Sequence, residues 1–195
     1  MNRTIFVAGL ATLAAQSAAG QEAFDLGTLV VSPSLSPVPE GEVASTLEVL
    51  TGDEIRGRDT GARDTLARLP GVSYSANGGL GARSTINIRG LDNKYIGVRL
   101  DGIDVSDPTS TQTSFNFGQL VGSGLSRIEV LKGSQSALYG SEAIGGVVNL
   151  QSWRPTRDGA SGEALLEAGS FGTLKGSASA GFRSERGEVA LTLGR

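Results

Sequence analysis

Few residues in this chain have the types and spacing that chemistry requires. Gly133-Ser134-Gln135-Ser136-Ala137 is close to the Gly-x-Ser-x-Gly turn that presents a nucleophilic serine, but an alanine replaces the second glycine. The chain contains no histidine and no cysteine, which excludes Ser-His and Cys-His catalysis, thiolate zinc sites and imidazole metal ligands. A Gly-Lys-Ser/Thr phosphate loop is also absent. We therefore predict that the protein is not an enzyme and uses no cofactor.

Carboxylates offer one further possibility. Asp101, Asp104 and Asp107 could converge on a cation, although their spacing is not that of an EF-hand loop. Aspartate also favours turns in solvated loops, and we prefer this interpretation. With 17 Lys and Arg residues against 20 Asp and Glu residues, the net charge of -3 gives no electrostatic indication of nucleic-acid binding.

The elements that would position a site are short and rich in turns. The 195 residues include 29 glycines and only 5% aromatic residues, a composition unlike that of a helical bundle. Strands are predicted at 127–131, where apolar residues alternate with Glu129, and at 147–150, which is mostly apolar. Between them, one short helical turn ends at Gly140, and a Gly-Gly corner bends the chain sharply.

The first 45 residues differ in composition from the rest. Residues 1–20 combine Arg3, an uncharged apolar stretch and small residues at the end, which predicts a secretory signal peptide. Residues 21–45 contain three prolines among Ser, Glu and Gly and are predicted to be a flexible segment. Within them, the β-prone island Asp25–Ser32 suits strand addition to the sheet of a partner, or a first strand on the protein's own sheet.

Short helices and strands are predicted to alternate from about residue 46 onward. Thr51 and Glu54 have the spacing of a capping box, which predicts that a helix begins there. Thr60 could cap a second helix, whose apolar face would consist of Ala62, Leu66 and Leu69. Strands follow at 71–74, 85–89 and 95–100, with a tight turn at Asp101-Gly102. Two loops, 73–84 and 104–119, lie between them, and a loop as long as the second is uncommon in a compact domain unless it binds something or is disordered.

From Gly162 onward the sequence alternates with a period of two. Three segments carry apolar residues on one face and polar or small residues on the other, with short turns between them. This pattern is typical of transmembrane β-barrels, but an ordinary antiparallel sheet gives it too. The smallest known barrels need eight strands, and these segments supply three at most. We therefore expect this chain to be the N-terminal portion of a longer protein, or a truncated product.

The run Arg127–Leu150 closely resembles the end of the plug domain in TonB-dependent outer-membrane receptors. Three earlier segments match the same family: Leu69-Pro70-Gly71-Val72, Ile86-Asn87-Ile88-Arg89-Gly90 and Val98-Arg99-Leu100-Asp101-Gly102-Ile103. Together the matches span about Asp25 to Leu150, and one departure is Ser134, where many members have proline. Within the family the sequence looks most like the cobalamin receptors.

The resemblance implies roles for particular residues. The periplasmic protein TonB would grasp a TonB box formed by Asp25, Leu26, Gly27, Thr28, Leu29, Val30, Val31 and Ser32. Loops at the top of the plug would contact a bulky ligand through Asn77, Gly78, Gly79, Gln112, Phe115 and Phe117, unless these side chains pack against a barrel wall. Arg89 and Lys132 would pair with acids on the inner barrel wall, unless they are ordinary surface cations.

The predicted fold class is α+β. A small mixed-sheet plug domain with short helices is followed by the first antiparallel strands of an incomplete transmembrane β-barrel. The predicted divisions are a signal peptide (1–20), a flexible TonB-box segment (21–45), a plug domain (46–155) and the start of a barrel (156–195). The resemblance implies a receptor in the Gram-negative outer membrane that takes up cobalamin, a ferric siderophore or haem, with TonB and membrane lipid as partners. The alternative is a soluble periplasmic interaction or signalling module that does not transport.

Overall fold

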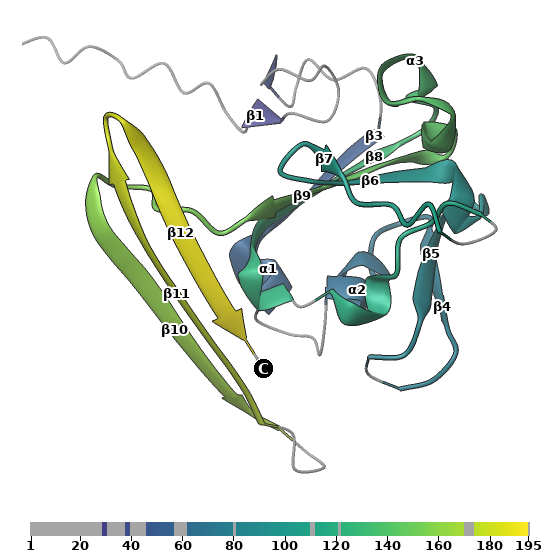
Figure 1. Ribbon diagram of the computed structural model, residues 1–195. Helices are drawn as coiled ribbons and strands as arrows, with labels where there is room; N and C mark the ends of the chain where they lie inside the picture. The colour runs from purple at the N-terminus through teal and green to yellow at the C-terminus, as the bar shows by residue number, and fades with distance from the viewer. Residues whose placement is uncertain are drawn as a thin grey trace, which may run out of the picture.

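A five-stranded sheet and a separate three-stranded sheet dominate the structure (Figure 1). The computed structural model describes residues 29–30, 38–39, 46–56, 62–79, 81–109, 112–120, 122–169 and 174–194. The signal peptide predicted at 1–20 and the helix cap predicted at Thr60 lie outside the described residues.

The five-stranded sheet is mixed, as predicted. Its strand order is β3-β8-β9-β6-β7, in which β6 and β9 run parallel and the other neighbours are antiparallel. The strands are β3 (Thr46–Thr51), β6 (Ile96–Leu100), β7 (Ile103–Asp104), β8 (Leu125–Lys132) and β9 (Gly146–Ser152). The observed ends differ from the predicted ones by a few residues, because local sequence defines the ends of strands poorly.

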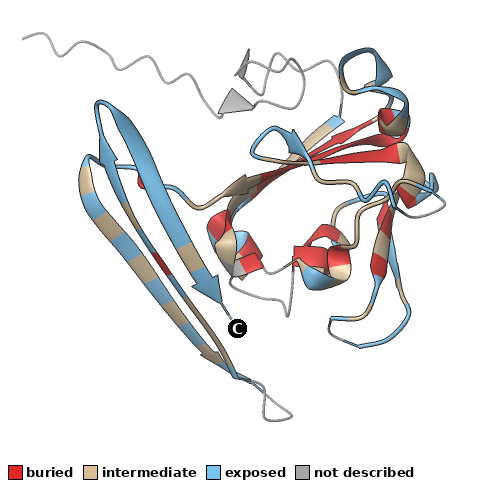
Figure 2. Ribbon diagram, viewed as in Figure 1, coloured by how far each residue is buried: buried red, intermediate tan, exposed pale blue. Residues whose placement is uncertain are grey.

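One face of this sheet forms the hydrophobic core with two short helices. Figure 1 places α1 (Gly52–Arg56) and α2 (Ala62–Leu66) on the same side of the sheet. Figure 2 shows the resulting band of buried residues across the central strands and both helices. The core includes Ile55, Ala62, Leu66, Val98, Ile128, Val130, Val148 and Leu150.

The predicted capping box is confirmed at the start of α1. The Glu54 carboxylate accepts a hydrogen bond from the Thr51 backbone N–H (2.8 Å) and another from the Thr51 hydroxyl (2.9 Å). A backbone N–H at the helix start has no partner within the helix, so this contact satisfies a group that would otherwise be left unpaired. The second predicted helix also forms as α2, with Ala62 and Leu66 in the core and Leu69 packed against it.

Two tight turns follow the prediction closely. At Asp101-Gly102 both residues have positive φ (50° and 85°), which suits a two-residue hairpin between β6 and β7. The short helical turn is α3 (Ser136–Tyr139), which Figure 1 places on the side of the sheet opposite α1, and it ends at Gly140 with φ 89°. A non-glycine residue would adopt that φ only with strain.

A small hairpin projects away from the sheet. It consists of β4 (Val72–Ala76) and β5 (Ser84–Ile88), which pair in register from Val72↔Ile88 to Ala76↔Ser84. Short 3-10 turns follow it in the chain, η2 (Asn93–Tyr95), η3 (Phe117–Gln119), η4 (Gly122–Gly124) and, after α3, η5 (Ser141–Ala143).

The three-stranded sheet lies beside the rest of the molecule (Figure 1). It contains β10 (Gly159–Ala168), β11 (Leu174–Ser184) and β12 (Gly187–Gly194) in antiparallel order, so the predicted alternating segments form adjacent strands. Among the described residues, no helix is long and apolar enough to span a bilayer.

The N-terminal island contributes a very short strand. β1 (Leu29–Val30) pairs antiparallel with β2 (Val38–Pro39) in a sheet of their own. In Figure 1, β1 lies at the opposite end of the molecule from the loop of the β4–β5 hairpin. The other residues of the predicted TonB box, 25–28 and 31–32, lie outside the described residues.

Candidate functional site

The structure joins the two long loops that the sequence singled out. We call residues 77–83 the hairpin loop and residues 105–119 the long loop; Leu80 and residues 110–111 are not among the described residues. The side-chain oxygen of Asn116 accepts hydrogen bonds from the backbone N–H of Ser84 and of Gly118, both at 3.0 Å. One amide side chain therefore holds the base of the hairpin loop against the long loop.

Close backbone packing reinforces this junction. A Cβ atom added to Gly118 would lie 1.8 Å from the carbonyl oxygen of Ala82, so only glycine allows the two loops to approach this closely. At the surface, the Arg83 guanidinium donates to the Ser114 hydroxyl at 3.3 Å.

The predicted ligand contacts fall into two groups. Asn77, Gly78, Gly79 and Gln112 are exposed on the two loops, where a ligand can reach them. Phe115 is half-buried and meets Phe117 edge to face, with 4.8 Å between ring centroids. Phe117 has no exposed surface and belongs to the hydrophobic core, because η3 packs against α2 and against β5 of the hairpin. Phe117 is therefore a core residue, and we do not propose it as a ligand contact.

A polar cavity of about 290 Å³ lies beside the junction. Its lining combines two cations, one carboxylate, two amides and two hydroxyls, from Arg83, Thr85, Asp92, Asn93, Lys94, Gln112 and Ser114. This mixture of donors and acceptors suits a polar group on a ligand. Apart from Gln112, sequence reasoning missed these residues, because their approach depends on how β5, η2 and the long loop pack together.

Asn93 is the most buried polar residue of this lining. Its amide nitrogen donates to the Phe115 carbonyl (3.0 Å), whereas its side-chain oxygen is buried without a hydrogen-bond partner among the described residues. An unsatisfied buried acceptor costs about 1–3 kcal/mol. A donor from a ligand or a water molecule would offset that cost.

The three-stranded sheet has faces of opposite character. Residues that point away from the plug are apolar and more than half exposed, namely Leu166, Leu174, Phe182, Val189, Leu191 and Leu193. The opposite face carries polar and small side chains, including Glu163, Lys175, Ser179, Glu188 and Thr192. Ser179 and Thr192 share a hydrogen bond of 3.0 Å across the strands on this face.

The polar face contacts the rest of the chain through ion pairs. Arg154, just before β10, reaches Asp101 at 3.3 Å and Glu188 at 2.8 Å, and the hydrogen bond that Arg154 donates to Glu188 is the main cause that raises the pKa of Arg154. Near α1, Arg56 pairs with Glu163 of β10 at 3.1 Å. The three-stranded sheet is therefore held to the five-stranded part at two separate points.

Comparison with known proteins agrees with this architecture. Residues 39–147, more than half of the chain, match the family model of the TonB-dependent Receptor Plug Domain. The chain belongs to the TonB-dependent receptor family. The predicted family and the α+β fold class are thereby confirmed.

Proteins similar to this chain include a vitamin transporter and two outer-membrane receptors. It is 32% identical over its whole length to the vitamin B12 transporter BtuB of Photobacterium profundum and covers 30% of that protein. Its fold is similar to the pyoverdine outer membrane receptor FpvA of Pseudomonas aeruginosa (TM-score 0.67, 20% identity, 85% of this chain and 24% of that one). It is also similar to the alcaligin receptor FauA of Bordetella pertussis (TM-score 0.65, 16% identity, 89% of this chain and 30% of that one). The chain thus spans less than a third of the length of these relatives.

The two cations predicted to face a barrel wall have different surroundings in this receptor chain. Lys132 is 3% exposed, and its ammonium donates to the Pro70 carbonyl (2.6 Å) and pairs with Glu48 (3.2 Å). Arg89 is exposed, has φ 51°, and donates to the Thr46 hydroxyl at 2.9 Å. Pairing of either residue with acids of a barrel wall stays a prediction.

A buried carboxylate in this receptor chain was not anticipated from the sequence. Glu129 alternates with Ile128 and Val130 as predicted, yet it is fully buried on the other face of the sheet. Arg127 lies 3.1 Å from its carboxylate, and the side-chain amides of Asn149 and Gln151 donate to it at 3.3 Å. A single alternating strand cannot reveal that both of its faces are covered, which is why this cluster was missed.

The three aspartates considered for a cation serve separate turns. Asp101 binds Ser152 and Arg154, Asp104 accepts from the Ser106 N–H, and Asp107 accepts from Thr109. The hydroxyl and backbone N–H of Thr109 hold the pKa of Asp107 below its ordinary value. Across the described parts of the chain, no group of three or more acidic side chains is placed to hold a metal ion.

Proposed function

We propose that this chain is the N-terminal part of an outer-membrane receptor that binds a bulky nutrient and imports it with energy delivered by TonB. The observation that carries the proposal is the pairing of a plug with a sheet whose apolar face points outward and whose polar face points to the plug. Strands of a transmembrane barrel around a polar interior have this arrangement.

The membrane location is supported by the exposed side chains of β10, β11 and β12. A soluble periplasmic module would expose this apolar face to water, where patches of such size are rare. Lipid would instead cover this face without cost. The transport proposal therefore explains why these apolar side chains are exposed, and the alternative does not. We propose the predicted division into signal peptide, TonB-box segment, plug and barrel start on the same grounds.

For the substrate we favour cobalamin. The support is the 32% identity with a vitamin B12 transporter over the whole chain, whereas the identity is 20% with the pyoverdine receptor FpvA and 16% with the alcaligin receptor FauA. The exposed residues Asn77, Gly78, Gly79 and Gln112, with Phe115 at their base, would contact the ligand. The polar cavity beside them would take a hydrogen-bonding group of the nutrient.

A binding experiment tests the substrate. Outer membranes that contain the full-length receptor are incubated with labelled cyanocobalamin, and in parallel with ferric pyoverdine and haemin. We expect saturable binding of cyanocobalamin alone, and its accumulation in cells that is lost when a protonophore collapses the proton gradient. Saturable binding of a ferric chelate instead would indicate that the substrate is a ferric chelate. Binding without energy-dependent accumulation would contradict transport.

TonB docking is tested at the strand β1. Its position at the end of the molecule opposite the hairpin loop suits a segment that faces the periplasm while the ligand binds outside. Leu29→Cys in the full-length receptor is combined with single cysteines in the periplasmic domain of TonB. We expect a ligand-stimulated crosslink from Leu29→Cys and none from Leu138→Cys, an exposed control in α3. Equal crosslinking at both positions would contradict specific docking.

A further inference from the structure

A buried arginine lies under the candidate binding loops. Arg63 belongs to α2 and is only 8% exposed, which is unusual because a buried charge loses its hydration. Its Nε lies 3.4 Å from the neighbouring carboxylate of Asp64, in ion-pair distance but outside hydrogen-bond geometry. Burial of such a group needs a structural or functional reason.

The guanidinium of Arg63 reaches into the hairpin loop rather than toward solvent. Its Nη1 donates to the Ser84 hydroxyl at 2.9 Å and lies 3.5 Å from the carbonyl oxygen of Gly79. The same group sits 5.8 Å from the ring centroid of Tyr74 on β4. One side chain thus touches both strands of the hairpin and its loop.

Ser84 continues this contact into the long loop. Its hydroxyl accepts from Arg63 and donates to the Ala82 carbonyl at 3.0 Å. Its backbone N–H donates to Asn116, which also accepts from the Gly118 N–H. A continuous chain of hydrogen bonds therefore leads from Arg63 of α2 through Ser84 and Asn116 to Gly118 of the long loop.

We propose that Arg63 is a positioning residue that holds the hairpin loop and the long loop together as one preformed ligand platform. Its planar group with several fixed donors suits this role better than a lysine would, because it engages Ser84, Gly79 and Asp64 at once. A preformed platform loses less conformational entropy when the nutrient binds. The effect on nutrient affinity rests on the proposed function, but the joining of the loops does not.

Amide hydrogen exchange on the chain itself tests the joining of the loops without any ligand. In Arg63→Met we expect the Ser84 and Gly118 amides to exchange about tenfold faster, since both bonds to Asn116 depend on a fixed Ser84. Arg63→Lys should restore part of the protection. The matched control is Arg83→Met, which removes an exposed contact between the same two loops and should change these rates less than about twofold.

Ser84→Ala provides a milder variant in case Arg63→Met does not fold. It removes the hydroxyl that Arg63 contacts and keeps the N–H that binds Asn116, so we expect faster exchange at Gly118, whose N–H shares the Asn116 oxygen with Ser84. Unchanged protection of Gly118 in both variants would overturn the proposal and leave Arg63 as a local anchor of the hairpin.

The consequence for binding is measured on the full-length receptor with cyanocobalamin. We expect Arg63→Met to raise Kd about tenfold, with partial rescue in Arg63→Lys and no change in Arg186→Met, on the distant turn after β11. Loosened loops with unchanged Kd would overturn the positioning role. Absence of cyanocobalamin binding by the unmodified receptor would contradict the proposed substrate, while the exchange result would still decide whether Arg63 joins the loops.

Discussion

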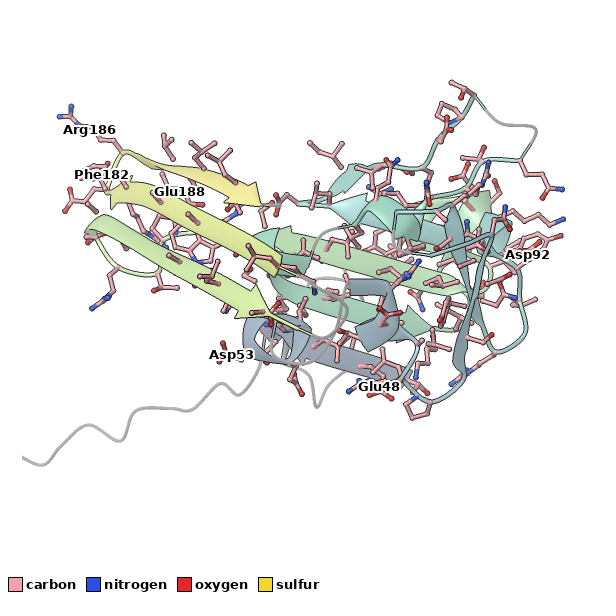
Figure 3. All side chains as sticks on the ribbon, turned by 90° about the horizontal axis from the view of Figure 1, so that it is seen from below. Glu48, Asp53, Asp92, Phe182, Arg186 and Glu188 are labelled. Carbon is pink, nitrogen blue, oxygen red and sulfur yellow. The ribbon has the colours of Figure 1, made fainter. Side chains whose placement is uncertain are left out.

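The two large sheets of this chain differ in where their apolar side chains lie. The five-stranded sheet buries both of its faces, one as an apolar core and the other around the carboxylate of Glu129. The three-stranded sheet leaves its apolar face exposed and turns its polar face toward the plug. In Figure 3, Asp92 lies at the end of the plug far from Phe182 and Arg186 on the strands.

This difference indicates two surroundings for one polypeptide. In the plug, burial of apolar side chains away from water stabilises the fold. In β10–β12 the apolar side chains are exposed, and under the proposed function lipid would cover them. The same kind of substitution should therefore change the free energy of unfolding by different amounts in the two sheets.

The largest expected difference concerns truncation of apolar side chains. Ile128→Ala in the core should lower the free energy of unfolding of the chain by about 2–5 kcal/mol, because it leaves a cavity in close-packed surroundings. Leu191→Ala on β12, an exposed position, should change it by less than about 0.5 kcal/mol in water. Denaturant unfolding of both variants checks this; equal losses would mean that the outer face of β12 is also packed.

Introducing a lysine on each face of β12 tests the difference between the two faces in lipid. Leu191→Lys points into the proposed bilayer and should destabilise the full-length receptor in vesicles by about 2–4 kcal/mol. Ala190→Lys, the neighbouring residue on the polar face, is the control and should be nearly neutral. Unfolding monitored by tryptophan fluorescence in vesicles measures both, and a neutral Leu191→Lys would argue against a lipid-facing surface.

A glycine in the plug tests close packing between the loops. Gly118→Ala should cost about 1–3 kcal/mol of unfolding free energy, because its Cβ would collide with the Ala82 carbonyl and force the loops apart. Gly79→Ala is the control, since no atom lies within 4 Å of its added Cβ. Similar losses in both variants would show that the loops do not pack as described.

The connection between the sheets is tested by exchanging the charges of one ion pair. Arg56→Glu or Glu163→Arg alone should each cost about 0.5–1 kcal/mol, because the pair is partly exposed and each change sets like charges together. The double exchange should recover most of the loss, whereas Glu167→Arg, a control on the same face of β10, should not be rescued by Arg56→Glu. A double-mutant cycle of unfolding free energies gives the coupling, and zero coupling would mean that the contact does not join the two parts.

The smallest expected effect concerns pH. Because the folded-state pKa of Asp107 lies below its unfolded value, its ionised form stabilises the long loop above that value, and the stabilisation is lost as pH falls through the folded pKa. The window therefore lies below about pH 3.9, the ordinary value for aspartate. Carboxyl NMR titration should show a lowered pKa that returns toward the ordinary value in Thr109→Val, and an unchanged pKa there would contradict the assigned cause.

Several elements of the fold were predictable because their causes are local. The helix start at Thr51 depends on Glu54 three residues later, and the turn at Asp101-Gly102 depends on two residues with positive φ. The alternation in β10–β12 follows from the period of a strand. The family was also evident, because the run from Arg127 to Leu150 is long and specific.

The candidate site was less predictable because its contacts are remote in sequence. Ser84 and Asn116 are 32 residues apart, and Arg63 lies 21 residues before Ser84. Nothing local distinguishes Phe117 in the core from Phe115 beside it, since both stand in the same polar loop. Only the packing of η3 against α2 and β5 decides which ring is buried.

The sequence by itself determined the kind of chain this is, the positions of its turns and strands, and the absence of histidine and cysteine chemistry. Such properties depend on residue types and on neighbours within one turn or one hairpin. The tertiary structure alone decided which charged groups are buried, that the two loops form one junction, and which face of β10–β12 meets the plug. Those outcomes depend on contacts between residues that are distant in sequence, and such contacts form only when the chain folds.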